Sequence, residues 1–228
     1  MSIFAFILAA AVANAPVPPG STVAIDTTEA NTWIGSTIEV QAWNRPDVSV
    51  DQEVTGGNED EVHAAVTRNG TAVTVTAQYT GERKSYFFGL LHSNSSKSFR
   101  WIVHVPAGRA VRVRETNGRI DVRGVTAALD LDTTNGRIAI AGAGPAISAH
   151  TDNGSIDATM TSLAGGAPKI ALSSTNGGVR LHVPRGFTTR VEAHTANGDV
   201  KNPLHDGTGP GTVSVDTTNG EIEITVGS

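Results

Sequence analysis

Histidine and acidic side chains are the residues of this sequence that could do chemistry at neutral pH. His150 and His194, two of seven histidines, each lie three positions before an Asn-Gly pair. Asp132 and Asp216 occupy the same position in two other copies of this pattern. A carboxylate beside an imidazole can orient it for proton transfer or metal binding. Two such pairs supply too few ligands for zinc, so we interpret them as a solvated polar column and predict no metal or other cofactor.

Asp121 and Asp157 are the carboxylates that most resemble the acid pair of a glycan-cleaving enzyme. They occupy equivalent positions in two copies of the pattern, with Ala139 at that position in the copy between them. Stacked copies would place them about 9.6 Å apart, beyond the retaining range and at the upper limit of the inverting range. The sequence also contains no phosphate-binding loop and no Gly-x-Ser-x-Gly elbow. We therefore predict a protein without catalytic residues and keep a β-helix enzyme acting on glycans as an alternative.

The segment that must position these side chains is an internal repeat. Asn-Gly recurs through the second half of the chain at spacings of 18, 18, 23, 21 and 22 residues. Apolar residues stand six and four positions before each Asn and three and five after it, with Asn202 the single polar exception. Gly and Asn tolerate the positive φ of a tight turn, so we predict a structural corner at each pair. The predicted corner residues are Asn117, Gly118, Asn135, Gly136, Asn153, Gly154, Asn176, Gly177, Asn197, Gly198, Asn219 and Gly220.

Two all-β folds satisfy this alternation of apolar and polar residues. A parallel β-solenoid stacks the copies as rungs, so that the apolar positions form inward columns. An antiparallel meander of Asn-Gly hairpins also satisfies it, because the position four before Asn would lie opposite the position five after it. All copies share one phase, and their other connections, such as 142–145 and 207–211, vary in length. We therefore favour a solenoid of about six rungs over residues 106–228.

Residues 16–105 differ from the repeat in composition. They contain all three tryptophans and several strand-like runs, and Arg68-Asn69-Gly70-Thr71 is a strong hairpin signal. The end of a solenoid is an open sheet edge that invites pairing with other chains. We therefore predict that this region is an N-terminal antiparallel β cap with degenerate rungs.

Residues 1–15 are typical of a signal peptide. A short apolar run is followed by small residues, which favours cleavage after Ala13. The run is too short to span a bilayer, so we predict no transmembrane segment and an exported protein, periplasmic or on the cell surface. The chain has no cysteine, which excludes disulfides and thiol chemistry. A net charge of -5 argues against nucleic acid as a partner.

The repeat resembles a bacterial family of β-strand-repeat proteins known as putative adhesins, a domain of unknown function with Asn-Gly rungs. The resemblance rests on the segment from Arg114 to Val122 and its five later copies, and on the segments that begin Val105-Pro106 and Val183-Pro184. It implies a parallel β-helix-like fold behind a signal peptide and no catalytic residues.

Together these observations predict an exported, non-catalytic protein of the cell envelope that presents ladders of polar side chains. We expect an adhesin-like binding or structural module, a monomer, whose partner is a glycan or an envelope protein. A self-assembling envelope scaffold is a further alternative. The final strand, Glu221-Ile222-Glu223-Ile224, carries Glu at alternate positions, which would discourage end-to-end pairing if it formed the edge.

Overall fold

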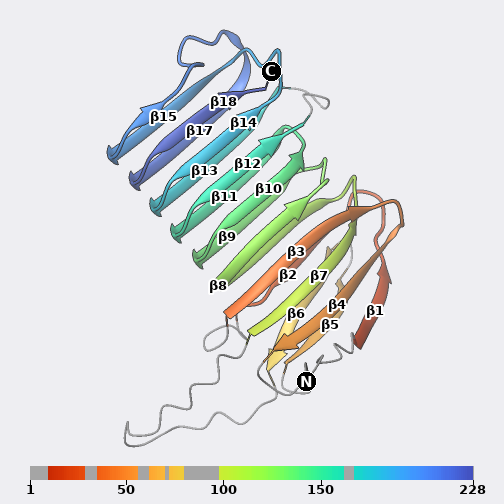
Figure 1. Ribbon diagram of the computed structural model, residues 1–228. Helices are drawn as coiled ribbons and strands as arrows, with labels where there is room; N and C mark the ends of the chain where they lie inside the picture. The colour runs from red at the N-terminus through yellow and green to blue at the C-terminus, as the bar shows by residue number, and fades with distance from the viewer. Residues whose placement is uncertain are drawn as a thin grey trace, which may run out of the picture.

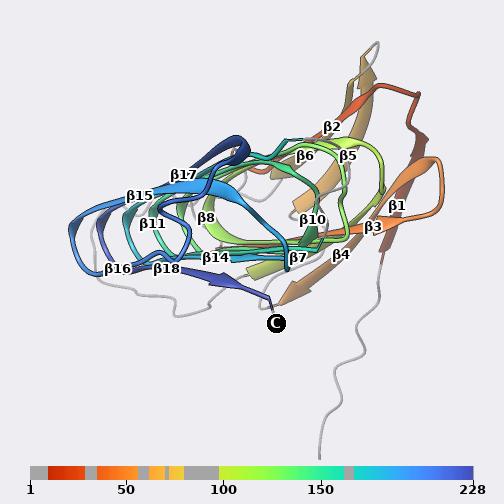
Figure 2. The ribbon, with the colours of Figure 1, turned by 90° about the horizontal axis from the view of Figure 1, so that it is seen from above.

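The computed structural model describes residues 10–28, 35–55, 62–69, 72–79, 98–161 and 167–227. These ranges contain eighteen β-strands and no helix. The rungs form two sheets that face each other, and the chain passes from one to the other at each corner (Figure 1). Seen along the stacking direction, the turns of the chain superimpose as flattened loops (Figure 2).

Each Asn-Gly copy forms one rung, with one strand on each side of the corner. The first rung is a single bent strand, β8 (Ala110–Arg123). The others are β9 (Leu129–Asn135) with β10 (Ile138–Ala143), β11 (Ala146–Asn153) with β12 (Ile156–Met160), β13 (Lys169–Asn176) with β14 (Val179–Val183), β15 (Thr189–Asn197) with β16 (Val200–Lys201), and β17 (Gly209–Asn219) with β18 (Ile222–Val226).

Neighbouring rungs pair in parallel, which confirms the predicted solenoid and excludes the meander. Ile138 pairs with Ile120 of the preceding rung and with Ile156 of the following one. The same register places the six corner asparagines in one column. Equivalent residues of successive copies therefore stack directly on one another.

The N-terminal region supplies two further rungs and three antiparallel strands. The rungs are β2 (Thr22–Asp26) with β3 (Gly35–Trp43), and β6 (Ala72–Tyr79) with β7 (Ser98–Pro106). The antiparallel strands are β1 (Ala10–Pro16), β4 (Asp47–Thr55) and β5 (Val62–Asn69). β5 pairs with β6, β4 pairs with β7, and β1 pairs with β4. The tip of the predicted Arg68–Thr71 hairpin lies outside the described residues, but its two strands, β5 and β6, are paired.

The spatial order of the rungs departs from the chain order at both ends. β17 and β18 lie between β13/β14 and β15/β16, so the last rung in sequence is an inner rung of the stack (Figure 1). In the same way β2 and β3 lie between β6/β7 and β8. Glu221–Ile224 therefore does not form the edge at which its glutamates would oppose end-to-end pairing, because β18 pairs on both sides. The edge rung is β15/β16.

The predicted inward columns form a continuous apolar core with its exceptions at the edge rung. Most of the column residues are no more than 3% exposed. Val200 of β16 is 42% exposed, although its equivalents Ile138 and Ile222 are fully buried. Asn202, the polar exception of the repeat, follows β16 directly. Both exceptions have one cause, since no further rung covers β15/β16 among the described residues.

The signal peptide stays a prediction. Ala10–Pro16 form β1, which pairs antiparallel with β4 from Ala10↔Gln52 to Pro16↔Asp47. Cleavage after Ala13 would leave the pairs at Ala15 and Pro16 in place. Among the described residues there is no helix with the length and apolarity needed to cross a membrane.

Candidate functional site

The corner asparagines form a continuous hydrogen-bonded ladder along one edge of the solenoid. From Asn135 onward, each side chain donates from Nδ2 to Oδ1 of the asparagine on the adjacent rung nearer to Asn117, so the ladder has one direction. The donors and acceptors are Asn135 to Asn117, Asn153 to Asn135, Asn176 to Asn153, Asn219 to Asn176, and Asn197 to Asn219, at 2.7–2.9 Å. The ladder follows the spatial order of the rungs, so Asn197 is its terminal member.

The corner glycines are required by close backbone approach. A Cβ on Gly136 would lie 1.7 Å from the carbonyl oxygen of Gly118, and one on Gly154 would lie 1.9 Å from that of Gly136. Only Gly177 and Gly198 among the six have positive φ. The predicted reason for glycine, a left-handed turn, is therefore wrong at the other four corners, because stacked rungs leave no room for a side chain there.

A second ladder runs beside the first. Two positions before each corner asparagine, five rungs carry a Thr or Ser whose hydroxyl donates to the corner glycine carbonyl of the adjacent rung; they are Thr133, Thr151, Ser174, Thr195 and Thr217. The first rung has Glu115 at this position. Its carboxylate accepts hydrogen bonds from the Thr27 hydroxyl and from the N–H groups of Thr116 and Asn117. Glu115 thereby joins the repeat to the end of β2.

Arginines line a groove of about 510 Å³ beside the first two corners. Its walls come from the starts of β3 and β7 and from the Asn117-Gly118 and Asn135-Gly136 corners. Arg100, Arg119 and Arg137 project into it, against one carboxylate, Glu53. Four of the predicted corner residues thus line this groove beside the three arginines.

The three arginines are held in different ways. Arg100 donates to Glu39 at 2.7 Å and to Glu53 at 3.3 Å, and the hydrogen bond to Glu39 raises its pKa further above the ordinary value. Arg119 contacts buried Asp121 through Nε alone, at 2.7 and 2.8 Å. Its two terminal nitrogens make no hydrogen bond to the described residues, and its side chain is 47% exposed. Arg119 therefore presents an unoccupied guanidinium fork to the groove.

The sequence profile described as Toastrack DUF4097 matches residues 110–225, from the first Asn-Gly rung to the end of the last. The chain belongs to the Toastrack family. None of the curated proteins compared with the sequence matches it.

One solved structure shares this fold at low sequence identity. A putative cell adhesion protein from Clostridium sporogenes has 12% identity and a TM-score of 0.58, covering 96% of this chain and 100% of that one. A putative adhesin from Bacteroides fragilis has 13% identity and a TM-score of 0.35, covering 95% and 97%. The first of these likenesses extends the common fold over the N-terminal region as well as the repeat.

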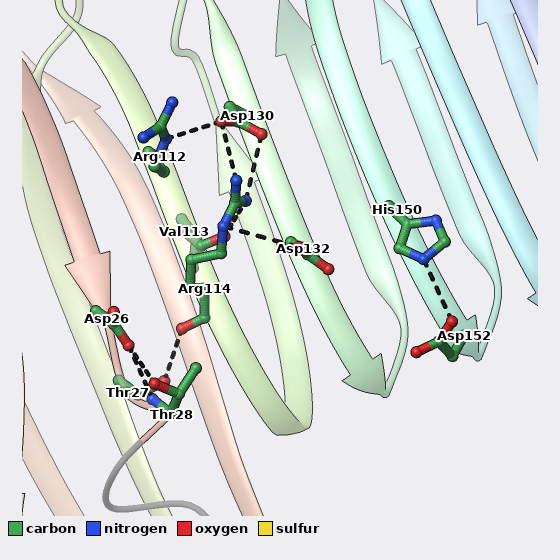
Figure 3. A network of polar contacts seen from close by, with 10 residues as sticks. All are labelled: Asp26, Thr27, Thr28, Arg112, Val113, Arg114, Asp130, Asp132, His150 and Asp152. Carbon is green, nitrogen blue, oxygen red and sulfur yellow. Dashed lines mark hydrogen bonds and ion pairs between the residues drawn. The ribbon is translucent and has the colours of Figure 1, made fainter.

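The two histidines of the Toastrack rungs, His150 and His194, lie on the outer face of the sheet that contains β11 and β15. The groove arginines Arg119 and Arg137 belong to the opposite sheet. As predicted, Asp132 is adjacent to His150, and His194 to Asp216. The imidazole of His150 nevertheless contacts Ser173 at 2.8 Å. Its other ring nitrogen contacts Asp152 at 3.3 Å (Figure 3). The surrounding hollow of about 430 Å³ is open and is lined mainly by Ser, Thr, His and Asp residues. The described residues contain no cluster of three or more His, Cys, Asp or Glu suited to a metal ion.

Arginines and carboxylates alternate on the same outer face. Arg112 and Arg114 both pair with Asp130, at 2.8 and 3.2 Å, and Arg114 also reaches Asp132 at 3.7 Å (Figure 3). The network pairs each charge with a neighbour on the same or the adjacent rung. Such exposed pairs each contribute little to stability.

The two carboxylates that sequence reasoning singled out are separated as predicted. Asp121 pairs with Ala139, which pairs with Asp157, so one rung lies between them. Asp121 contacts Arg119, while Asp157 contacts Arg137 and Arg180. Neither faces the other across a cleft. Instead they fix the arginines that line the groove.

Sequence reasoning missed the groove because half of its wall lies outside the repeat. Arg119 and Arg137 occupy equivalent positions in adjacent copies, each directly after its corner glycine. Arg100 belongs to β7, which pairs with β3, and Thr37 of β3 pairs with both Arg100 and Arg119. Only the insertion of β2/β3 between the repeat and β6/β7 brings these three arginines to one hollow.

Proposed function

We propose that this protein is an exported, non-catalytic surface module that binds an acidic glycan of the cell envelope in the arginine groove. The observation that carries the proposal is the open guanidinium fork of Arg119 between Arg100 and Arg137. A guanidinium matches a carboxylate or phosphate group with two parallel hydrogen bonds. A repeated anionic polymer can engage several such groups in succession along the stack.

The shape of the solenoid supports binding through many weak contacts. Strands stack at about 4.8 Å, so side chains on one face form regular rows. Several weak contacts on one polymer add to a useful total affinity without any dominant residue. The adhesion-related names of the two solved structures agree with a surface role, and we extend that role to this chain, as a monomer exported to the periplasm or surface.

The arrangement of carboxylates favours binding over glycan cleavage. A glycosidase needs two carboxyl groups that face one bond, one to donate a proton and one to attack or activate water. Here Asp121 and Asp157 are engaged by arginines on the same face. We propose that they orient the guanidinium groups for a ligand.

The test measures binding of full-length protein to polygalacturonate and, as a neutral control, to dextran. We expect retention by the acidic polymer only, weakening as salt is added because the contacts are exposed and ionic. Arg119→Ala should weaken binding about tenfold, the loss of one charged hydrogen-bonding group. Arg112→Ala, which removes an exposed, ion-paired arginine from the opposite sheet, should leave binding unchanged.

Two results would overturn the proposal. Equal loss of binding in the Arg119→Ala and Arg112→Ala variants would show that net charge, and not the groove, retains the polymer. Release of reducing sugar from the acidic polymer, absent in an Asp121→Asn variant, would establish the glycan-cleaving alternative.

A further inference from the structure

We infer that the Asn197-Gly198 corner is a site of spontaneous covalent modification, at which Asn197 is converted to aspartate and isoaspartate. The inference is independent of the proposed function. It rests on a difference between this corner and the other five, which share the same Asn-Gly sequence and are protected by the stack.

The reaction needs only the two residues and water. The backbone nitrogen of Gly198 attacks Cγ of the Asn197 side chain, forming a C–N bond. The Cγ–Nδ2 bond breaks, and Nδ2 leaves as ammonia with the proton lost from the Gly198 amide. Water then opens the resulting succinimide ring at either carbonyl, giving aspartate or isoaspartate. Glycine favours the first step because no side chain hinders the attacking nitrogen.

Two hydrogen bonds oppose this reaction at the inner corners. The side-chain Oδ1 of each inner asparagine accepts from Nδ2 of the next rung, which fixes the amide. At four inner corners the glycine N–H that would attack also donates to the asparagine carbonyl of the next rung; they are Gly136, Gly154, Gly177 and Gly220. At the fifth, Gly118 lies inside the continuous strand β8 and pairs with Ser36.

The terminal corner lacks both protections. Asn197 donates to Asn219, but no rung lies beyond it among the described strands to donate to its own Oδ1. The N–H of Gly198 likewise has no next-rung carbonyl to meet. Gly198 is exposed, whereas the other five corner glycines are half-buried. Among the described corners, this is therefore the one at which both the attacking N–H and the side-chain Oδ1 lack a hydrogen bond with a further rung.

Conversion would loosen the edge rung. A carboxylate cannot donate to Oδ1 of Asn219, so the last hydrogen bond of the ladder would be lost. The new charge would stand two residues from Asp199, and isoaspartate would lengthen the backbone at the corner. The modification thus falls on the edge rung, where the loss of one ladder hydrogen bond disturbs the apolar core least.

The test incubates folded full-length protein at mildly alkaline pH and follows each asparagine by peptide mapping with mass spectrometry. A parallel sample unfolded in denaturant gives the intrinsic rate of each Asn-Gly pair. We expect the rate at Asn197, relative to its unfolded reference, to exceed that of the inner five roughly tenfold or more, from the loss of two protecting hydrogen bonds. Asn69-Gly70, whose glycine lies outside the described residues, is scored separately.

A matched variant tests whether Asn197 is the modified residue. Asn197→Gln should abolish the modified peptide, because the longer side chain cyclises far more slowly, and should leave the other five rates unchanged. Uniform protection of all six corners, or faster conversion at an inner corner than at Asn197, would overturn the inference.

Discussion

The open sheet edges at the two ends of the solenoid are covered in different ways. At the N-terminal end, β4 and β5 pair antiparallel with the outermost rung, and β1 adds to β4. At the C-terminal end, a short loop replaces a further rung: Leu204 accepts from the Val191 N–H, and the Asn202 amide donates to the Val191 carbonyl. The first end is covered by strands, whereas at the second Asn202 and Leu204 of the loop bond to Val191, which explains why Asn202 interrupts the apolar column.

Both ends nevertheless protect the rung that is terminal in the chain. β2/β3 and β17/β18 each lie one step inside the stack, paired on both sides. A strand at a chain end frays most readily when it is also an edge strand. Exchanging the order of the last two rungs places a chain-internal rung at the edge, held by connections on both sides. Stability therefore depends on the position of a rung in the stack, and not in the sequence.

The largest expected effect compares equivalent apolar positions in the middle and at the edge. Ile138→Asp should destabilise the protein by about 4 kcal/mol or more, because an unpaired charge is buried between Ile120 and Ile156. Val200→Asp, at the equivalent position of the edge rung, should change stability by less than about 0.5 kcal/mol. Denaturant unfolding measures both. Similar losses for the two variants would contradict the assignment of β15/β16 to the edge.

The asparagine ladder predicts a smaller difference in stability between a variant in the middle of the stack and one at its edge. Asn153→Ala removes a donor and an acceptor, each worth about 1 kcal/mol, whereas Asn197→Ala removes one such bond. We expect the first variant to lose about twice as much free energy of unfolding as the second. Thermal unfolding of the two variants, with Asn44→Ala as an exposed control, would show this ratio. Equal losses would mean that the ladder continues beyond Asn197.

The smallest effect concerns Glu115, where the ladder of hydroxyl groups ends. Burial raises its pKa above the ordinary value of 4.5, because the enclosed site disfavours the charged carboxylate. A group whose pKa is higher in the folded than in the unfolded chain stabilises the fold most when protonated. Its contribution therefore falls as pH rises from the unfolded pKa through the folded one, and is constant above.

Glu115→Gln should remove this dependence. Relative to the variant, the natural protein should lose stability as pH increases from about 4.5, the opposite of a carboxylate in an ion pair. Glu192→Gln, on the exposed face of β15, controls for the loss of one charge. Parallel profiles of stability against pH for the natural protein and the Glu115→Gln variant would show that burial of Glu115 does not shift the folding equilibrium.

The repeat made most of the fold predictable. Six copies in one phase determined the inward columns and the stacking of His150 beside Asp132, because equivalent residues of a solenoid must align. The order of the rungs could not be predicted, since Val213 and Val191 fit either place in the stack equally well. Only the polar Asn202 distinguishes the edge rung in the sequence, where it reads as a minor irregularity.

The candidate groove was less predictable for a related reason. Arg100 carries no repeat signature, and its approach to Arg119 depends on β3 lying between their strands. The roles of the corner residues were predicted only in part. Asn-Gly marked the corners, but the amide ladder and the close approach at Gly136 arise from stacking between rungs, which local turn preferences do not contain.

Native-state hydrogen exchange, followed by peptide mass spectrometry, tests the exchanged rung order most directly. The structure predicts that peptides from β15 and β16 exchange first within the repeat, while those from β17 and β18 are protected as well as those from β13 and β14. Earliest exchange in β17 and β18, the strands at the end of the chain, would contradict the insertion and restore a stack in sequence order.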